Sequence, residues 1–390
     1  MKARAVGSLF LGLALAFNAH QRIESAERSA SETGLVAGAQ QRPDAFIPGV
    51  PTIVSSPLKL AKAIRIPGLT LGAVDIFWVE ESTQRLYFAD RTNGSVDIID
   101  TSNDTFVTRV PGFGPPTGFG NGPNGVQWVP GNKLWVGDGP SRVRVIDLNL
   151  SPPSIIQTID TGGALRADEL AYDPADHILM VGNNYDTPPF LTFISTDTYA
   201  ILGKLVISDA TGLEQPVWDP QLNRMLLNVP NYTDLRGAGV AVINPVTRTI
   251  DKTYQMPNKC EGTGLALGPF QRLLVACGRP IIINAVNGNV INTITQVRSG
   301  DEVWYNSGDG QFYVASTDTN GSPVLGVIDA ETATWRQNVP VGRAIRNVSA
   351  FAGNNHIYVA SVAPPAGTPD TSACASFGFV GVGCIAVFTH

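Results

Sequence analysis

A short apolar run recurs along this chain and constrains its fold more than any other feature. Residues 86–90 (LYFAD) recur as residues 134–138 (LWVGD), and further copies lie at 179–183, 225–228, 273–277, 312–316 and 357–361. Tyr87 and Trp135 are 48 positions apart, and Tyr313 and Tyr358 are 45 apart. A repeat of about 40–50 residues is the usual length of one β-propeller blade.

Residues 82–107 show what one repeat contains. Three strand-like runs alternate there with two turns, at residues 91–94 (RTNG) and 100–103 (DTSN). We expect a hairpin turn at the first, because Asn-Gly accepts the positive φ of a type I′ turn. Asp and Asn side chains can close the second by bonding to nearby backbone groups. A lone sheet of this size cannot bury its own faces, so each repeat needs neighbours.

The number of repeats predicts the complete architecture. We count seven, which indicates an all-β fold, a seven-bladed β-propeller of four-stranded antiparallel blades. The last repeat has three strands of its own, at residues 348–351, 357–361 and 384–388. The strand-like segment at 60–66 can supply the fourth, so we expect the ring to be closed by an N-terminal strand joining the last blade. Such closure leaves no open sheet edge.

The composition agrees with this fold and excludes one class of partner. Charged residues make up only 15% of the chain, whereas it contains 40 glycines and 28 prolines, which favours strands joined by many tight turns. The net charge is −6 and no basic cluster is present, so we expect no nucleic-acid partner. We expect the protein to be a monomer.

The N-terminal residues predict export. Lys2 and Arg4 precede an apolar core at residues 9–17, the pattern of a secretory signal, and cleavage after Ala16 or Ala19 fits. We predict a signal peptide at 1–19, a disordered leader or linker at 20–45 and the propeller at 46–390. The protein would then be secreted or periplasmic. No later apolar run is long enough for a membrane span.

The four cysteines are consistent with an oxidising compartment. An even number of cysteines in an exported chain indicates disulfides, and three pairings are possible. We favour the two pairs that are close in sequence, Cys260–Cys277 and Cys374–Cys384, with free buried cysteines as the alternative. None has the CxxC spacing of a zinc site.

Two sequence resemblances refine these expectations. The segments LYFADRTNGSVDIID and VGRAIRNVSAF, the latter followed by HIYVAS, resemble the YVTN-type repeats of bacterial and archaeal seven-bladed propellers. Pro123-Asn124-Gly125 is similar to a segment of the regucalcin and gluconolactonase family, whose propellers usually have six blades. This second resemblance implies a divalent metal held by Glu, Asn and Asp side chains and a lactonase-like activity.

One polar residue stands at the start of each repeat, where the innermost strand of a blade would line the central channel. These residues are Asp75, Asn124, Glu169, Gln215, Thr263, Glu302 and Asn347, and neighbouring positions add Asp168, Glu214, Glu261, Asp301 and Arg346. We expect them to converge at one mouth of the channel. Crowded carboxylates repel unless a cation or a proton relieves them, although polar residues at a wet channel mouth need no role beyond solvation.

The resemblance implies specific roles for some of these residues. Asp75, Asn124, Glu169 and Glu302 are the expected ligands of a divalent cation, with Ca²⁺ preferred because it takes oxygen ligands. The metal would polarise a lactone carbonyl and activate a bound water. Glu302 or Glu169 would then be the catalytic general base.

The remaining candidates are ligand contacts around the same mouth. We expect Gln215, Arg346 and Asn347 to contact a small-molecule or glycan ligand. Long connections between the second and third strands of a blade reach this face, and they add Tyr185, Tyr232, Asp234 and Arg236. The Gly-rich residues 114–125 open no helix, so we interpret them as a long connection rather than a phosphate loop. The alternative explanation for these loops is sequence drift at the protein surface without a role in binding.

The sequence therefore supports three hypotheses about function. The first is an exported, divalent-metal-dependent hydrolase of lactone type acting at the channel mouth. The second is a non-catalytic propeller scaffold that binds a ligand or a protein through its loops. The third is a propeller isomerase, lyase or cyclase. The fold alone does not choose among them, because one propeller architecture hosts many chemistries.

Overall fold

The computed structural model describes residues 56–114, 121–233, 237–257, 260–298, 300–343 and 346–390. The predicted signal peptide and leader lie outside these residues. The described part is almost entirely β-structure, and its helical segments are two short 3-10 turns, η1 (Pro269–Gln271) and η2 (Ala375–Phe377).

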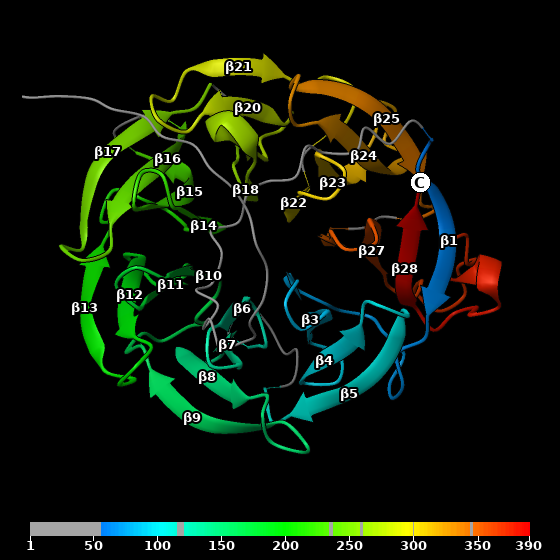
Figure 1. Cartoon of the computed structure of the whole chain (residues 1–390), viewed down its shortest axis with the longest axis horizontal. Helices are drawn as coiled ribbons and strands as arrows, with labels where there is room; N and C mark the ends of the chain where they lie inside the picture. The colour runs from blue at the N-terminus through cyan, green and yellow to red at the C-terminus, as the bar shows by residue number, and fades with distance from the viewer. Residues whose placement is uncertain (1–55, 115–120, 234–236, 258–259, 299, 344–345) are drawn as a thin grey trace, which may run out of the picture. The chain divides into compact units, whose positions relative to one another are not determined.

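Seven four-stranded antiparallel sheets form the blades of a ring around a central channel (Figure 1). Blade 1 contains β2 (Phe77–Glu80), β3 (Arg85–Asp90), β4 (Ser95–Asp100) and β5 (Thr105–Pro111). Blade 2 contains β6 (Val126–Val129), β7 (Lys133–Asp138), β8 (Arg142–Asp147) and β9 (Ser154–Asp160). Blade 3 contains β10 (Leu170–Asp173), β11 (Ile178–Asn183), β12 (Phe190–Ser195) and β13 (Ile201–Val206). Blades 4 and 5 contain β14 (Pro216–Asp219), β15 (Arg224–Tyr232), β16 (Gly237–Asn244) and β17 (Thr249–Gln255); and β18 (Leu265–Leu267), β19 (Arg272–Val275), β20 (Ile281–Asn284) and β21 (Val290–Thr293). Blade 6 contains β22 (Val303–Asn306), β23 (Gln311–Thr317), β24 (Pro323–Asp329) and β25 (Thr334–Pro340).

Blade 7 joins the two ends of the described chain. It consists of β26 (Val348–Phe351), β27 (His356–Ser361) and β28 (Cys384–Thr389), completed by β1 (Lys59–Ile64) as its outermost strand. β1 and β28 run antiparallel and lie side by side in Figure 1, with Ile64 opposite Ile385. The predicted seven-bladed propeller and its closure by an N-terminal strand are therefore confirmed.

The blades pack face to face, and this explains why the recurring runs are apolar throughout. Successive side chains of a strand point to opposite faces of its sheet. Tyr87 of β3 accordingly packs in the cluster between blades 1 and 2, whereas its neighbour Phe88 packs in the cluster between blades 7 and 1. An apolar cluster of this kind fills each of the seven interfaces between adjacent blades. The outermost strands are more exposed, as in β13.

The turn at 91–94 differs from our prediction. Four residues, rather than two, connect β3 to β4, and only Gly94 of this connection has a positive φ, 59°. A type I′ turn requires positive φ at both central residues, so the prediction of that turn type was wrong. A Cβ atom on Gly94 would also lie 2.9 Å from the carbonyl oxygen of Phe113, so the close approach of this loop favours glycine there.

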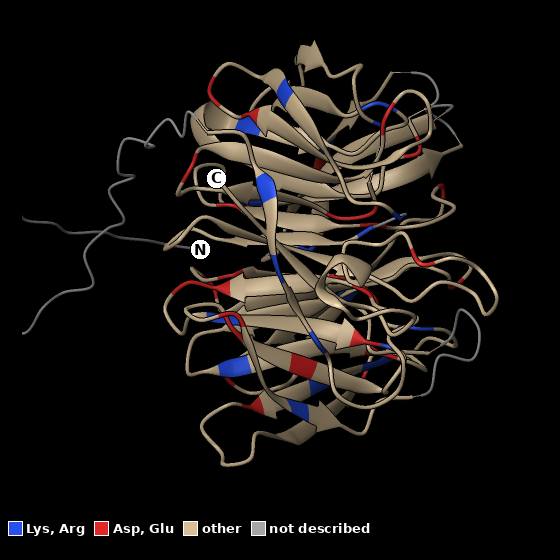
Figure 2. Cartoon of the chain, turned by 90° about the vertical axis from the view of Figure 1, so that its right-hand side faces the viewer, with Lys and Arg blue, Asp and Glu red and all other residues tan. Residues whose placement is uncertain are grey.

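Both predicted disulfides are present. Cys260–Cys277 joins the segment before β18 to the segment after β19, and Cys374–Cys384 joins η2 to the start of β28. All four cysteines are buried. In the side view of Figure 2, acidic and basic residues are interspersed over the strands and turns that face the viewer. None of the helices in the described ranges has the length and apolar character that a bilayer crossing requires.

The packing of blade 7 yields a first prediction. Phe388 of β28 is fully buried in the cluster between blades 6 and 7. Phe388→Ala should lower the free energy of unfolding by about 3–5 kcal/mol, because it leaves a cavity in the interface that closes the ring. Val107→Ala on the exposed side of β5 should change it by less than about 0.5 kcal/mol. Urea denaturation followed by tryptophan fluorescence measures both, and equal losses would contradict this role of the interface.

The C-terminal residue adds a polar contact at the same junction. His390 Nδ1 lies 2.8 Å from the carbonyl oxygen of Ser56, and its Nε2 lies 3.4 Å from Asp309 Oδ2. Tyr313 donates a hydrogen bond of 2.6 Å to the same carboxylate. Burial opposes protonation of His390, but its hydrogen bonds to Asp309 and Ser56 and the charge of Asp309 outweigh burial and raise its pKa.

This contact predicts a pH dependence of stability. Because the pKa of His390 is higher in the folded protein than the ordinary value of 6.5, its stabilising contribution is complete below about pH 6.5 and is lost as the pH rises through the folded-state pKa. The difference in melting temperature between the wild type and His390→Gln should therefore be larger at about pH 5.5 than at about pH 9. Val107→Ala, which removes no titratable group, should show the same difference at both pH values. A pH-independent effect of His390→Gln would contradict the prediction.

Candidate functional site

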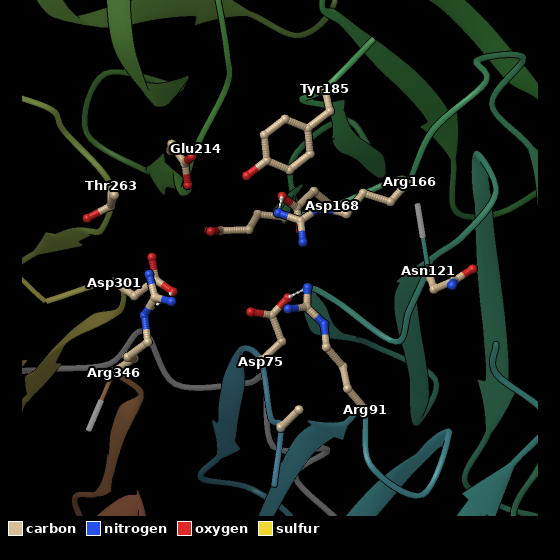
Figure 3. Close-up of a pocket in the computed structure, with 12 residues that line it drawn as sticks. Asp75, Arg91, Asn121, Arg166, Asp168, Tyr185, Glu214, Thr263, Asp301 and Arg346 are labelled. Carbon is tan, nitrogen blue, oxygen red and sulfur yellow. Dashed lines mark hydrogen bonds and ion pairs between the residues drawn. The ribbon is translucent and has the colours of Figure 1, made fainter. Parts of the chain in front are cut away.

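The segments that precede the innermost strands of all seven blades meet at one end of the channel, which we call the channel mouth. A cavity of about 490 Å³ lies there. Every blade contributes to its lining, which consists of Ala73, Asp75, Arg91, Asn121, Arg166, Asp168, Glu169, Tyr185, Glu214, Thr263, Asp301 and Arg346. Figure 3 shows the labelled side chains arranged around this space. Part of the predicted set of polar residues therefore meets at this cavity, namely Asp75, Asp168, Glu169, Glu214, Thr263, Asp301 and Arg346.

Three arginine–aspartate pairs surround the cavity. Arg91 forms an ion pair with Asp75. Arg166 pairs with Asp168 at 2.6 Å, and Arg346 pairs with Asp301 at 3.3 Å (Figure 3). A guanidinium group has five N–H donors in a fixed plane, so one aspartate does not exhaust its capacity to donate. The mouth therefore presents three cationic groups whose positions are fixed by carboxylates.

Arg166 is the most enclosed of the three arginines. Its side chain is 12% exposed, and its guanidinium carbon lies 4.8 Å from the ring centre of Tyr185, which is a cation–π contact. Its Nε also donates to Asn184 Oδ1 at 3.4 Å. Burial alone would lower the pKa of Arg166, but the charges of Asp168 and Asp75 outweigh burial and raise it. Arg166 is consequently a permanent positive charge at this site.

The carboxylates of the mouth outnumber the arginines, and burial together with mutual repulsion raises their pKa values. Burial raises the pKa of Asp168 to about 6 against the opposing charge of Arg166. Burial and the charges of Asp168 and Asp301 raise the pKa of Glu214 to about 8. Burial, followed by the charges of Asp168 and Glu214, raises the pKa of Glu169 well above its ordinary value. The mouth therefore holds one or more protons at neutral pH.

Glu169 has the most distinctive environment of these carboxylates. It is 9% exposed and lines the cavity, and its Oε2 is buried without a hydrogen-bond partner. An unpartnered buried polar atom costs free energy, and such atoms in native proteins often have a role in binding or catalysis. The carboxyl group of Glu169 therefore combines a place on the cavity lining with an oxygen that no protein group satisfies.

Two glycines of blade 2 allow the backbone of Asp168 and Glu169 to reach the mouth. A Cβ atom on Gly125 would lie 2.5 Å from the carbonyl oxygen of Asp168, and one on Gly137 would lie 2.2 Å from the same oxygen. Contacts this short are not found in proteins, so both positions need glycine for steric reasons. The Pro123-Asn124-Gly125 segment, singled out in the sequence, thus contributes to the site through its backbone as well as through Asn124.

The structure separates the predicted site residues into two groups. Asp75, Glu169, Tyr185 and Arg346 line the cavity. The other predicted site residues that stand before innermost strands lie beside the cavity rather than on its surface, and they are Asn124, Gln215, Glu302 and Asn347. Their contacts link neighbouring segments of the ring.

Three of these linking contacts are well defined. Glu302 is fully buried, and its carboxylate accepts from the backbone N–H of Phe77 at 3.1 and 3.2 Å, so it joins blade 6 to blade 1. Gln215 Oε1 accepts from the N–H of Leu265 at 2.8 Å and joins blade 4 to blade 5. Asn124 Nδ2 donates to the carbonyl oxygen of Ala167 at 2.9 Å and joins blade 2 to blade 3. Burial raises the pKa of Glu302 well above its ordinary value.

Tyr232 lies away from the channel mouth. It is 2% exposed in the apolar cluster between blades 3 and 4, and it pairs with Ala210 through an isolated β-bridge. The sequence placed it in a surface connection because β15 continues further than the recurring run indicates, to Tyr232 itself. Asp234 and Arg236 lie outside the described residues.

The predicted cation ligands do not form a common site in this conformation. Arg91 is ion-paired with Asp75 and also donates to Asn124 Oδ1 at 2.5 Å, and Glu302 is occupied by the N–H of Phe77. Within the described ranges, no group of three or more His, Cys, Asp or Glu side chains is placed to hold a metal ion. The predicted Ca²⁺ stays a prediction. In this arrangement the aspartates of the mouth pair with arginine guanidinium groups and do not form a site for a divalent cation.

Sequence reasoning missed Arg91 and Arg166. Arg91 begins the connection that we interpreted only as a turn, and Arg166 precedes Asp168 by two positions. A sequence signal existed for Arg91, because the connection between the second and third strands of each blade was expected to reach this face. Asn121 comes from the Gly-rich segment 114–125, of which residues 115–120 lie outside the described part.

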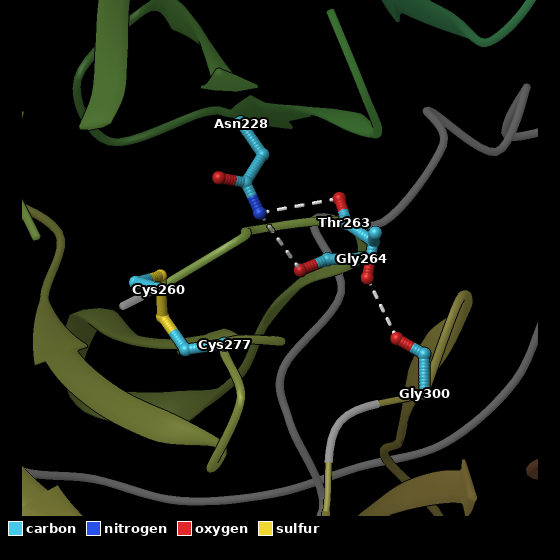
Figure 4. The surroundings of a disulfide bond; sticks show 6 residues. All are labelled: Asn228, Cys260, Thr263, Gly264, Cys277 and Gly300. Atoms are coloured by element: carbon cyan, nitrogen blue, oxygen red, sulfur yellow. Dashed lines mark hydrogen bonds between the residues drawn. A yellow bond between two sulfur atoms is a disulfide. The ribbon is translucent and has the colours of Figure 1, made fainter. Parts of the chain in front are cut away.

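Hydrogen bonds and a disulfide hold the wall of the mouth formed by blade 5. Thr263 Oγ1 donates to the carbonyl oxygen of Gly300 at 2.7 Å, and Asn228 Nδ2 donates to the carbonyl oxygen of Thr263 at 3.2 Å (Figure 4). Cys260, bonded to Cys277, anchors the same segment three residues before Thr263. This wall therefore has several independent constraints on its backbone.

Comparisons of the chain with models of known protein families and with curated protein sequences found no match. The function is therefore inferred from the geometry and chemistry of the channel mouth.

The Arg166–Asp168 pair gives a prediction that tests the electrostatics of the mouth. In Arg166→Leu the pKa of Asp168 should rise above about 6, because burial would no longer be opposed by the arginine. The variant should be about 3–5 kcal/mol less stable above that pKa, where Asp168 would be a buried unpaired charge. A carboxyl with a raised folded-state pKa costs stability progressively as the pH rises through that value, so the loss should shrink toward pH 4.

Arg224→Leu is the matched control for this variant. It breaks the Arg224–Asp251 pair, whose side chains are 27% and 37% exposed, so it should cost less than about 1 kcal/mol at every pH. Urea denaturation at several pH values measures both variants. A small, pH-independent loss in Arg166→Leu would show that Asp168 does not depend on Arg166.

Proposed function

We propose that the channel mouth is the active site of a hydrolase that opens lactones, the cyclic esters of sugar acids. The observation that carries this proposal is the carboxyl group of Glu169, which lines the cavity beside carboxylates of raised pKa and among three arginines and has one buried, unpartnered oxygen. The resemblance of Pro123-Asn124-Gly125 to the gluconolactonase family supports the same reaction class.

Substrate binding in this proposal uses the polar lining of the cavity. A sugar lactone carries several hydroxyl groups, each of which can donate one hydrogen bond and accept others. The carboxyl group of Glu169 would accept from one hydroxyl, and the arginine N–H groups would donate to others. A volume of about 490 Å³ falls within the range of roughly 300–1,000 Å³ typical of small-molecule sites. The ring of Tyr185 offers an apolar face to the sugar.

The proposed reaction combines oxyanion stabilisation with general acid–base catalysis. An ionised carboxylate takes a proton from water as the water oxygen bonds to the lactone carbonyl carbon. Guanidinium N–H groups, led by Arg166, stabilise the negative charge that develops on the carbonyl oxygen. The bond from the carbonyl carbon to the ring oxygen then breaks, and a protonated carboxyl gives its proton to that oxygen. The product is the open hydroxy acid.

Glu169 and Glu214 suit the two proton-transfer roles because their pKa values are coupled. The charge of Glu214 raises the pKa of Glu169, so protonation of Glu214 favours ionisation of Glu169 near neutral pH. We assign Glu214 as the acid, since its pKa of about 8 keeps it protonated at pH 7. We assign Glu169, which lines the cavity, as the base, since its ionisation is no longer opposed by the charge of Glu214 once Glu214 is protonated.

A non-catalytic binding site is the second candidate function. The pairing of every arginine in the mouth with an aspartate favours it, because such pairs present alternating donors and acceptors to the hydroxyl groups of a glycan. In that case the raised carboxyl pKa values would be a consequence of burial alone. For either function we infer that the protein is exported, because the N-terminal signal pattern and two disulfides both indicate an oxidising compartment.

A lactonase assay tests the proposal. We expect the wild type to hydrolyse members of a panel of five- and six-carbon aldonolactones, and we expect Glu169→Gln and Glu214→Gln each to lower kcat/KM by about 10²–10⁴-fold. The wild-type rate should fall as the pH rises through about 8, where Glu214 loses its proton. Glu331→Gln, at an exposed position in blade 6, is the control and should match the wild type. Binding of the lactones without turnover would favour the scaffold function instead.

Treatment with a chelator distinguishes this arginine-based mechanism from the divalent-metal-dependent mechanism expected from the sequence. With arginines as the electrophilic groups, EDTA should change neither kcat/KM nor the melting temperature. One divalent ion per chain by elemental analysis, together with loss of activity after chelation, would replace the arginines by a bound cation in the mechanism.

A further inference from the structure

A second polar cavity adjoins the channel mouth at the boundary between blades 5 and 6. It has a volume of about 260 Å³ and opens beside the segments that precede β18 and β22. We call it the side groove. Its lining includes Glu261, Thr263, Asp301, Ser316, Thr317 and Arg346.

The side groove and the channel mouth share a wall. Thr263, Asp301 and Arg346 line both cavities. The wall is fixed at Thr263, whose hydroxyl donates to the carbonyl oxygen of Gly300 (Figure 4). It is open at Arg346, whose side chain is 75% exposed and is held by a single ion pair of 3.3 Å to Asp301. A ligand can therefore pass from one cavity to the other over the Arg346–Asp301 pair.

The chemistry of the side groove resembles that of the mouth. Its lining combines hydroxyl groups of threonine and serine with the carboxylates of Glu261 and Asp301 and the guanidinium of Arg346. Hydroxyl groups of a sugar both donate and accept, and this lining supplies partners of both kinds. Among the described residues, the lining lacks the large apolar side chains that an aliphatic or aromatic ligand would need, and its mixed charges do not select a purely anionic ligand.

From this juxtaposition we infer that the side groove is a subsite for a second sugar unit. This inference rests on the proposed function and extends it: the reactive lactone unit occupies the channel mouth, and the unit attached to it lies across the Arg346–Asp301 pair in the side groove. The substrate class is then the lactone of an oligosaccharide acid rather than of a single sugar acid. Binding energy from the second unit would raise the specificity for the longer substrate.

Two probes with the same reactive end test the inference, D-glucono-1,5-lactone with one sugar unit and cellobiono-1,5-lactone with two. For the wild type we expect kcat/KM to be about tenfold higher for the two-unit lactone. Thr317→Trp fills the side groove from the last residue of β23, and it should lower the ratio of the two kcat/KM values to about one. Thr319→Trp places the same bulk at an exposed position two residues away that does not line the groove, so it should keep the wild-type ratio.

A second variant guards against misfolding of Thr317→Trp. Glu261→Ala removes an acceptor from the groove without adding bulk, and it should lower the same ratio. If the one-unit lactone is hydrolysed but the wild-type ratio is near one and neither groove variant changes it, the subsite is excluded while the proposed function stands. If neither lactone is hydrolysed, and neither binds in calorimetry, both the proposed function and the subsite fail. If both bind without turnover, the same ratio is measured as a ratio of Kd values.

Discussion

Face-to-face packing between blades is the interaction on which the rest of this structure depends. Each four-stranded sheet is apolar on both faces, as the adjacent residues Leu226 and Leu227 of β15 show by entering the clusters on opposite sides of blade 4. A sheet of this kind must be covered twice, and seven such sheets meet the requirement by closing into a ring. The closure has to include blade 7, whose own three strands are completed by β1. The two ends of the described chain are thereby fixed to each other.

Ring closure has an electrostatic consequence at the channel mouth. Because each innermost strand begins at that end, the polar residues before the seven strands are brought together whatever their charges are. Asp168 and Glu169 become buried, and Glu214 and Asp301 half-buried, near one another, which disfavours the ionised form of all of them. Two features of the structure reduce this repulsion: arginines form ion pairs with the aspartates, and the glutamates bind protons. The second feature makes acid–base chemistry possible at neutral pH.

Some polar residues around the mouth stabilise the ring, whereas others line the cavity. Glu302 and Gln215 use their side chains to bond the backbone of another blade, so they contribute to the precision of the ring. Glu169 occupies an equivalent place in its repeat, yet it lines the cavity and one of its carboxylate oxygens is buried without a partner. Equivalent positions in a repeat therefore carry different roles, and the difference depends on which neighbour supplies a donor. A rigid frame around a few unsatisfied groups is the arrangement that preorganised sites require.

The amino-acid sequence by itself determined the seven repeats, the closing strand, both disulfides and the ring of polar residues, because each depends on local pattern and spacing. It could not separate the residues of the cavity from those that bond blades together, such as Glu169 from Glu302. It also did not reveal Arg91 and Arg166, which reach the mouth from a turn and from a connecting segment. Those assignments depend on distances between side chains of different blades, and only the closed ring sets such distances. The pKa values of the mouth follow from the same closure, since burial and charge proximity are properties of the tertiary structure.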